Sequence, residues 1–294
     1  MSTLVYDNSQ LQEFKNCQYR YWLKYGEGYK KRQEGGDSHD RAFGTAIHAG
    51  LETHYKGGGW DDCKLAFTKL YPDQLQPDDL AKTQENGIRI LEAYIEHYRQ
   101  EDKKWKVLAC EEVGEMELAP GIKYTVKIDL IVENLEHGGI YVVDHKTTGK
   151  SFDYRYWAQF EPNSQLTGYC AYAEFRFGAC SGAFINGIRL GHRQRAYKGE
   201  PAGFYYEFQR QLFNRNQKQI NDWKQNALGW IEQLQNAKDN NRWLKNEAAC
   251  TYCQYRPICI PVWDPRDEAD RECIEIQYAK VDPKAYLKAT PDAA

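Results

Sequence analysis

The stretch KIDLIVENLEHGGIYVVDHKTTG, residues 127–149, decides the fold. It consists of two apolar strands joined by turn residues at 134–139, a pattern typical of an antiparallel hairpin. Because side chains alternate along a strand, Asp144 and Lys146 point to the same face. The turn makes the two strands neighbours, so Asp129 of the first strand can meet Asp144 on that face.

These two carboxylates and the lysine suggest a cation site. Two carboxylates held close together repel each other unless a cation lies between them. Their hard oxygen ligands suit Mg²⁺ or Mn²⁺, and the ammonium of Lys146 can orient or deprotonate an attacking water. The alternative is an ion pair between Asp144 and Lys146 at a strand end, with Asp129 on a solvated face.

Helical patterns precede and follow this hairpin. The first third of the chain has the three- and four-residue apolar spacing of helices, and a strand, a helix, two strands and a long helix complete the order. The expected helices are 7–25, 43–55, 60–71, 79–100, 163–177 and 213–245, and the further strands are 106–118, 181–190 and 203–211. The polar tail after Cys259 is predicted to be irregular.

Two pairs of residues four apart add to the candidate site. Gln165 and Tyr169 share one helix face, where an amide and a hydroxyl can hold a phosphate or a nucleic-acid strand. Gly44 and His48 share another, where the glycine permits close backbone approach and the histidine can ligate a metal. The alternative for both pairs is ordinary core packing.

Composition limits the class of protein. The 294 residues are 41% hydrophobic and 28% charged, which excludes disorder over most of the chain. No apolar run approaches the roughly 20 residues of a membrane-spanning helix, and Met1 to Gln10 lacks the pattern of a secretory signal. We therefore expect a cytoplasmic protein without membrane contact. The net charge of −3 means that a DNA-binding surface must be a local basic patch.

Nine cysteines require an explanation in a cytoplasmic protein. Cys63, Cys110, Cys170, Cys180 and Cys273 are scattered, and burial as small apolar side chains suffices for them. Cys250, Cys253 and Cys259 form a C-x2-C-x5-C run, and Cys17 can supply a fourth thiolate. Such a set can hold zinc or an iron–sulfur cluster, and the third reading is buried or free thiols.

Taken in order, these residues resemble the RecB-type branch of the PD-(D/E)XK nuclease superfamily. The matching pieces are GTAIH at 44–48, KIDLIV at 127–132, VVDHKTTG at 142–149 and QLTGY at 165–169. The resemblance implies an α/β (α+β) fold, a restriction-endonuclease-like core with a mixed central sheet flanked by helices, plus a helical N-terminal region and a C-terminal cysteine segment. We expect residues 1–40 to hold the first cluster cysteine, 41–212 to form the nuclease core with a helical insertion at about 60–100, 213–262 to hold a helix and the cysteine run, and 263–294 to form a tail.

The resemblance also assigns roles to residues. It implies metal binding by His48, Asp129, Asp144 and the main-chain carbonyl of His145. It implies catalysis by the two aspartates together with Lys146, Gln165 and Tyr169. One subfamily, which includes the AddB nuclease domain, the CRISPR-associated adaptation nuclease and a eukaryotic mitochondrial exonuclease, holds a 4Fe–4S cluster on four cysteines. These correspond to Cys17, Cys250, Cys253 and Cys259.

The implied activity is that of a Mg²⁺- or Mn²⁺-dependent deoxyribonuclease, an exonuclease on single-stranded DNA ends in the 5′ to 3′ direction, acting in recombination, repair or CRISPR adaptation. Basic residues that can contact the DNA backbone are Lys30, Lys31, Arg32, Arg189, Arg193, Arg195 and Lys198. Two alternatives stay open. One is a catalytically inactive DNA-binding or scaffold protein of the same fold, and the other replaces the cluster by Zn²⁺.

Overall fold

A computed structural model describes residues 3–32, 39–72, 80–196, 199 and 201–282. The chain divides into two compact units. Unit 1 consists of Met1–Gly35, Val113–Val126 and Asn221–Ala294, and unit 2 consists of Gly36–Glu112 and Lys127–Ile220. Strands β3 (Trp105–Ala119) and β4 (Ile122–Asn134) and helix α8 (Gln217–Asp239) contribute residues to both units.

The sheet of unit 2 is mixed. Strand β4 pairs with β3 and runs antiparallel to β5 (Ile140–Thr148). Strand β5 runs parallel to β6 (Gly182–Arg193), which in turn is antiparallel to β7 (Gly203–Asn214). A parallel pair needs a crossover, and the chain between β5 and β6 forms α6 (Tyr154–Ala158) and α7 (Ser164–Phe177).

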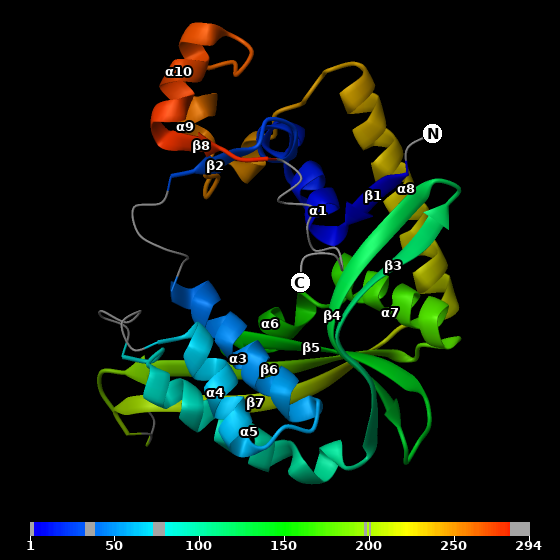
Figure 1. Cartoon of the computed structure of the whole chain (residues 1–294), viewed down its shortest axis with the longest axis vertical. Coiled ribbons are helices and arrows are strands. Elements are labelled where there is room, and N and C mark those ends of the chain that lie inside the picture. The colour runs from blue at the N-terminus through cyan, green and yellow to red at the C-terminus, as the bar shows by residue number, and fades with distance from the viewer. Residues whose placement is uncertain (1–2, 33–38, 73–79, 197–198, 200, 283–294) are drawn as a thin grey trace. The chain divides into compact units, whose positions relative to one another are not determined.

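Helices flank this sheet on both faces (Figure 1). One face is covered by α3 (His39–Tyr55), α4 (Trp60–Leu70) and α5 (Gln84–Asp102). Their buried side chains form one core with Ile188 and Leu190 of β6. Because strand side chains alternate, Gly187 faces the other side, where a Cβ atom would lie 2.7 Å from the ring of Phe152. Helix α7 contacts β5 and β6 on that second face.

Unit 1 gathers segments that are distant in the sequence. Strand β1 (Leu4–Asp7) pairs parallel with the first residues of β4, and β2 (Tyr29–Lys31) pairs antiparallel with β8 (Tyr278–Lys280). The helical elements are α1 (Asn8–Asn16), α2 (Gln18–Tyr21), the π-helix η1 (Trp22–Gly26), the 3₁₀ turn η3 (Glu247–Ala249), α9 (Arg256–Cys259) and α10 (Glu268–Gln277).

Tyrosines join the two ends of the described chain within unit 1. Tyr29, Tyr255 and Tyr278 are fully buried. The hydroxyl of Tyr255 donates a hydrogen bond to the carbonyl oxygen of Tyr29 at 2.6 Å, and its ring stacks on that of Tyr278 with centroids 5.7 Å apart. Large, rigid rings with a polar tip suit this position, which accounts for three of the 22 tyrosines in the chain.

The predicted mixed α/β architecture with a sheet flanked by helices is confirmed, and three local expectations are wrong. The helix expected at 213–245 begins only at Gln217, after the end of β7, and ends at Asp239. The helix expected at 7–25 is interrupted at Cys17, which is extended at φ −166° and ψ 117° between α1 and α2. The tail expected to be irregular after Cys259 contains α10 and β8. Asp267 caps α10 through hydrogen bonds from the N–H groups of Ala269 and Asp270. The helix buries a single side chain, Ile274, so its apolar pattern was too weak to detect.

Within the ranges that the structure describes, no helix combines the length and the apolar character required to cross a membrane.

Candidate active site

Asp129 and Asp144 lie opposite each other on adjacent strands of unit 2. The antiparallel register pairs Leu130 with Val143, so the next step along the ladder places the two aspartates on one face. The backbone N–H of His145 donates a hydrogen bond to Asp129 Oδ2 at 2.8 Å. The structure therefore brings the two carboxylates together, while their metal-binding role stays a prediction.

Lys146 pairs with the more deeply buried of these carboxylates. Its Nζ atom lies 2.6 Å from Asp144 Oδ2, and the side chains are 36% and 4% exposed respectively. His145, between them, points toward α5, where its Nδ1 lies 3.5 Å from the hydroxyl of Tyr94. Asp144 and Lys146 consequently point to the face that α6 and α7 cover. The side chain of Lys146 is therefore partly exposed to solvent, while the carboxylate that pairs with it is buried.

Helix α3 brings His48 to the same place. Its Nε2 atom lies 2.9 Å from the carbonyl oxygen of His145, and its Nδ1 atom lies 3.4 Å from Asp129 Oδ1. One turn earlier, a Cβ atom at Gly44 would be 3.1 Å from Oγ1 of Thr147. The glycine therefore allows the close approach of α3 to β5 that the sequence suggested.

A third carboxylate, which the sequence reading missed, completes the group. Glu111 of β3 contributes an oxygen that lies within 4.8 Å of ligand atoms of His48 and Asp129, and among the described residues no other trio of histidine, cysteine or acidic side chains is so close. Glu111 has a φ of 51°, which is unusual for a residue other than glycine. Lys127 on the adjacent β4 lies 2.7 Å from its carboxylate. The adjacent acidic residues Glu111 and Glu112 within a predicted strand are the sequence feature that could have pointed to a possible ligand.

The charges of the site shift several pKa values. Burial acts to raise the pKa of Asp129, but His48 and His145 outweigh it and hold this pKa below its ordinary value. Burial, opposed by Lys146 and reinforced by Asp129, raises the pKa of Asp144. Burial acts to lower the pKa of His48, yet the charge of Asp129 raises it above the usual value. A site that concentrates negative charge in this way favours a bound cation.

Three side chains of α6 and α7 belong to the same face of the sheet. Gln165 Nε2 donates a hydrogen bond to the hydroxyl of Tyr169 at 2.8 Å, so the two side chains meet as their spacing predicts. The hydroxyl of Tyr156 in α6 is buried and has no hydrogen-bond partner among the described residues. Burial and the charge of Asp144 raise the pKa of Tyr156 to about 12.

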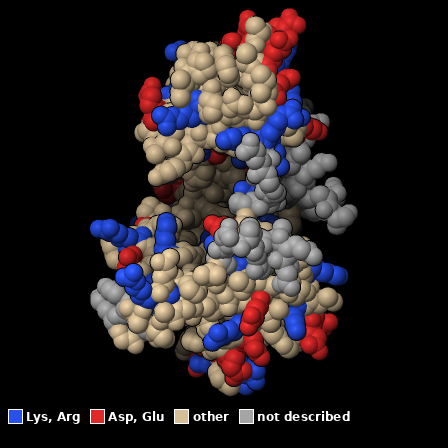
Figure 2. Space-filling view, turned by 90° about the vertical axis from the view of Figure 1, so that its left-hand side faces the viewer, with Lys and Arg blue, Asp and Glu red and all other residues tan. Residues whose placement is uncertain are grey.

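The predicted basic residues form two separate sets. Lys30 and Lys31 are exposed on β2, and Arg32 is exposed beside them, all in unit 1. In unit 2, Arg193 lies 3.9 Å from the ring centroid of Tyr205, while Arg189 pairs with Glu207 at 2.9 Å. Arg195 is exposed, and Lys198 lies outside the described residues. Figure 2 shows Lys and Arg in small groups among acidic and uncharged side chains.

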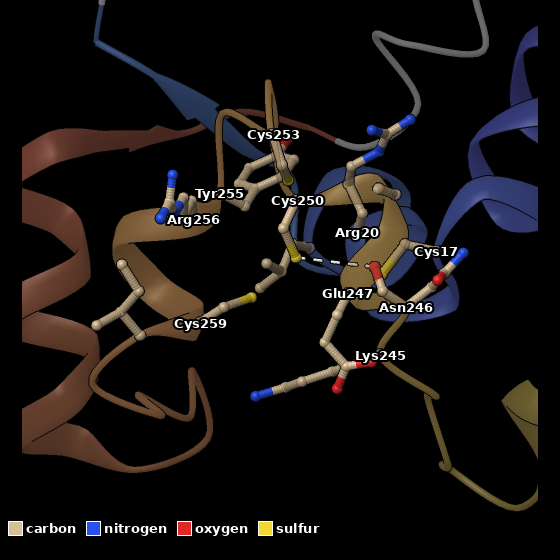
Figure 3. Close-up of a pocket in the computed structure, with 13 residues that line it drawn as sticks. Cys17, Arg20, Lys245, Asn246, Glu247, Cys250, Cys253, Tyr255, Arg256 and Cys259 are labelled. Atoms are coloured by element: carbon tan, nitrogen blue, oxygen red, sulfur yellow. Dashed lines mark hydrogen bonds between the residues drawn. The ribbon is translucent and has the colours of Figure 1, made fainter.

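The four cysteines of the predicted cluster line one cavity of unit 1. It has a volume of about 240 Å³, and Arg20, Lys245 and Arg256 also line it. Figure 3 shows Cys17 on one segment and Cys250, Cys253 and Cys259 on another, around the same space. Burial and the three other thiols raise the pKa of Cys259 to about 11, against the opposing effect of Lys245. The break between α1 and α2 is what places Cys17 here.

Comparison with known proteins defines the class. The sequence profile of the PD-(D/E)XK nuclease superfamily matches residues 8–260. Because the match covers most of its length, the chain belongs to the PD-(D/E)XK nuclease superfamily.

Two solved structures illustrate the comparison, and the first of them shares the fold at low sequence identity. A candidate exonuclease from Eubacterium rectale is 14% identical with a TM-score of 0.51, and the similarity covers 85% of this chain and 86% of that one. An alkaline exonuclease from Laribacter hongkongensis, LHK-Exo, is 11% identical with a TM-score of 0.28, and the similarity covers 68% of this chain and 95% of that one. No curated protein sequence matches the chain.

Proposed function

We propose that the protein is a deoxyribonuclease that depends on Mg²⁺ or Mn²⁺. The observation that carries this proposal is the convergence of His48, Glu111 and Asp129 within 4.8 Å, next to the pair formed by Asp144 and Lys146. Carboxylate oxygens suit both cations, and an imidazole nitrogen is acceptable to Mn²⁺. The donor set therefore fits a divalent ion held by these residues, with the carbonyl oxygen of His145 as a further ligand.

The residues of the site have distinct tasks in phosphodiester hydrolysis. A divalent ion held there would lower the pKa of a coordinated water and neutralise charge on the scissile phosphate. Lys146 orients the attacking water and donates to the phosphoryl oxygen, while Asp144 fixes the ammonium group at 2.6 Å. Gln165 and Tyr169 guide the substrate strand through their amide and hydroxyl donors.

For the substrate, we propose single-stranded DNA ends, degraded from 5′ to 3′ in recombination, repair or CRISPR adaptation. This proposal is supported by the resemblance of the motifs. The contact of Arg193 with Tyr205 adds a cationic and aromatic surface of the kind that binds phosphate and stacks on unpaired bases. Blocking either end of a labelled strand tests exonuclease action and polarity directly. Equal cleavage of a circular single strand would refute the requirement for an end.

The nuclease proposal is tested with labelled single-stranded DNA and Mn²⁺. We expect Lys146→Ala to reduce the cleavage rate by roughly 10²- to 10⁴-fold, the range for loss of a group that transfers or positions a proton. Lys150→Ala, at an exposed position four residues later, is the matched control and should cleave at the wild-type rate. Cleavage by Lys146→Ala at full rate would show that the activity belongs to another site or to a contaminant.

For the four cysteines we propose a structural 4Fe–4S cluster. No three of these sulfurs, all within the described residues, lie within 4.8 Å of one another. In a tetrahedral zinc site with Zn–S bonds of about 2.3 Å, adjacent sulfurs would be about 3.8 Å apart. A cubane binds each thiolate at a different iron and so needs a wider cavity, and the three cations that line it balance the charge of a cluster. The proposal is supported by the four cysteines around one cavity, which Arg20, Lys245, Arg256 and Glu247 also line.

Anaerobic purification with analysis of iron, acid-labile sulfide and zinc tests this assignment. We expect iron and sulfide in near-equal amounts, and we expect Cys253→Ser to lower both together with the melting temperature. Cys63→Ser, at a buried cysteine of unit 2, should leave the metal content unchanged. A colourless protein that contains zinc would decide for the alternative, and unchanged melting of Cys253→Ser would show that the cysteines hold no structural group.

A further inference from the structure

A connected set of buried and partly buried polar side chains surrounds the imidazole of His145. We call it the His145 network, and its members come from helices α3 and α5 and strands β6 and β7: Tyr55, Tyr94, Asp102, Asn186 and Arg210. His145 is 3% exposed and Asn186 is fully buried. Polar groups buried so deeply must be paired, and the way these are paired fixes the orientation of the ring.

Asn186 is the centre of the network. Arg210 has donors only, so its Nε atom, 2.8 Å from Asn186 Oδ1, determines which way the amide points. The amide nitrogen then faces the opposite side, where it donates to the hydroxyl of Tyr94 at 2.6 Å and lies 3.4 Å from His145 Nδ1. Arg210 thus orients the imidazole of His145 indirectly, through the amide of Asn186.

Asp102 and Tyr55 join the network from the helical side, where Nη1 of Arg210 also lies 3.3 Å from the exposed carboxylate of Glu101. Arg210 Nη1 donates to Asp102 Oδ1 at 2.8 Å, and the hydroxyl of Tyr55 donates to Asp102 Oδ2 at 2.8 Å. The ring of Tyr55 stacks on the imidazole of His145 with centroids 5.7 Å apart and an interplanar angle of 18°. Arg210 itself lies 3.9 Å from the ring centroid of Tyr98, which shields the buried charge.

The backbone of His145 is where the network meets the active site. Its N–H binds the carboxylate of Asp129, and its carbonyl oxygen accepts from His48. In the sheet, His145 is in register with Asn186 of β6. The same residue therefore presents its main chain to two candidate metal ligands and its side chain to the network.

We propose that the His145 network positions the main chain of His145 for metal binding, with Arg210 and Tyr94 as positioning residues. This inference rests on the proposed function, since it concerns the ligands of that site. A hydrogen-bonded polar network restricts the geometry of the groups it holds, and Arg210 contributes through Nε and Nη1, while its Nη2 is buried without a hydrogen-bond partner among the described residues. Outer partners of metal ligands typically contribute 10- to 100-fold to metal affinity or activity. A buried arginine is a poor device for stability alone, because apolar replacements of buried ion pairs are often equally stable.

The test measures Mn²⁺ binding by calorimetry, independently of catalysis. Tyr94→Phe removes the hydroxyl that accepts from Asn186, and Arg210→Lys cannot bridge Asn186 and Asp102 in the same geometry. We expect both variants to raise the Mn²⁺ dissociation constant by roughly 10-fold or more, with kcat at saturating Mn²⁺ within a few-fold of wild type. Phe67→Leu, in the same helical layer, is the control for general destabilisation and should bind Mn²⁺ like wild type.

The outcomes separate this inference from the proposed function. Wild-type protein that binds Mn²⁺ and cleaves DNA supports the proposed function, and unchanged Mn²⁺ affinity in Tyr94→Phe and Arg210→Lys would then overturn the inference alone. An equal loss of affinity in Phe67→Leu would also overturn it, because the effect would reflect stability. Wild-type protein without Mn²⁺ binding would refute both.

Discussion

Arg215 anchors the segment that carries Gln165, and its removal is expected to destabilise unit 2. The side chain is 5% exposed. Its Nε atom donates to Oγ1 of Thr167 at 3.0 Å, Nη1 donates to the carbonyl oxygen of Asn214 at 2.9 Å, and Nη2 donates to that of Phe160 at 2.9 Å. One guanidinium group therefore ties the end of β7 to the loop before α7 and to its first turn.

The magnitude follows from these three bonds. Hydrogen bonds to charged groups contribute about 1.5–3 kcal/mol each, so Arg215→Met removes a gross stabilisation of about 4.5–9 kcal/mol. Relief of the several kcal/mol that burial of the charge costs offsets part of this loss. The hydroxyl of Thr167 also keeps its bond to the carbonyl of Asn163. We expect the free energy of unfolding to fall by about 3 kcal/mol, which is the gross loss less the relief of the desolvation cost.

Urea unfolding of the metal-free protein measures this change, and Arg189→Met is the matched control. Arg189 forms an ion pair with Glu207, and the two side chains are 20% and 40% exposed respectively; pairs that are open to solvent contribute about 0–1 kcal/mol. An unfolding midpoint for Arg215→Met equal to that of Arg189→Met would refute the anchoring argument. A cleavage rate that falls in Arg215→Met well below its melting temperature would further indicate that the anchor positions Gln165.

Two further predictions concern the metal ligands. Glu111→Gln removes a charge within 4.8 Å of His48 and Asp129, so the Mn²⁺ dissociation constant should rise by at least about 10-fold; an unchanged value in calorimetry would exclude Glu111 as a ligand. The second prediction concerns the metal-free protein in EDTA, where the pKa of His48 is raised and that of Asp129 is lowered. The stabilising interaction between these two side chains is fully present between about pH 4 and 6.5. It is lost as the pH rises through the pKa of His48 and as the pH falls through the pKa of Asp129. The difference in melting temperature between wild type and His48→Ala should therefore be largest near pH 5.5 and smallest near pH 9, and a difference independent of pH would contradict the assignment.

The hairpin at 127–149 was predictable because its information is local. Alternation set which side chains of each strand share a face, and the short turn set the pairing. This was enough to place Asp129 opposite Asp144 and Lys146 beside it. The helix pairs were predictable for the same reason, since a spacing of four determines that Gln165 meets Tyr169 whatever surrounds them.

Glu111 was not predictable because its strand contains several equivalent candidates. Glu112, Glu115 and Glu117 follow within six residues. Which one approaches His48 depends on the pairing of β3 with β4 and on the positive φ at Glu111, and neither is encoded by alternation. The interruption of the first helix at Cys17 was not predicted for a related reason: the apolar spacing of the helix continues through the break.

The sequence did not predict a role for the side chain of His145, because this side chain lies on the opposite face of β5 from Asp144 and Lys146. Successive residues of this strand point to opposite faces, so Asp144 and Lys146 can serve the chemistry only if His145 points into the helical layer. Tyr55 lies two turns after His48 on α3, so one helix face both supplies a candidate ligand and stacks on this imidazole. The main chain of His145 is then held between the two faces, and substitutions in α3 or α5 that never touch DNA should alter metal affinity. Because the candidate site is built on strand β5, side-chain packing on the face of the sheet away from the substrate also determines the geometry of the site.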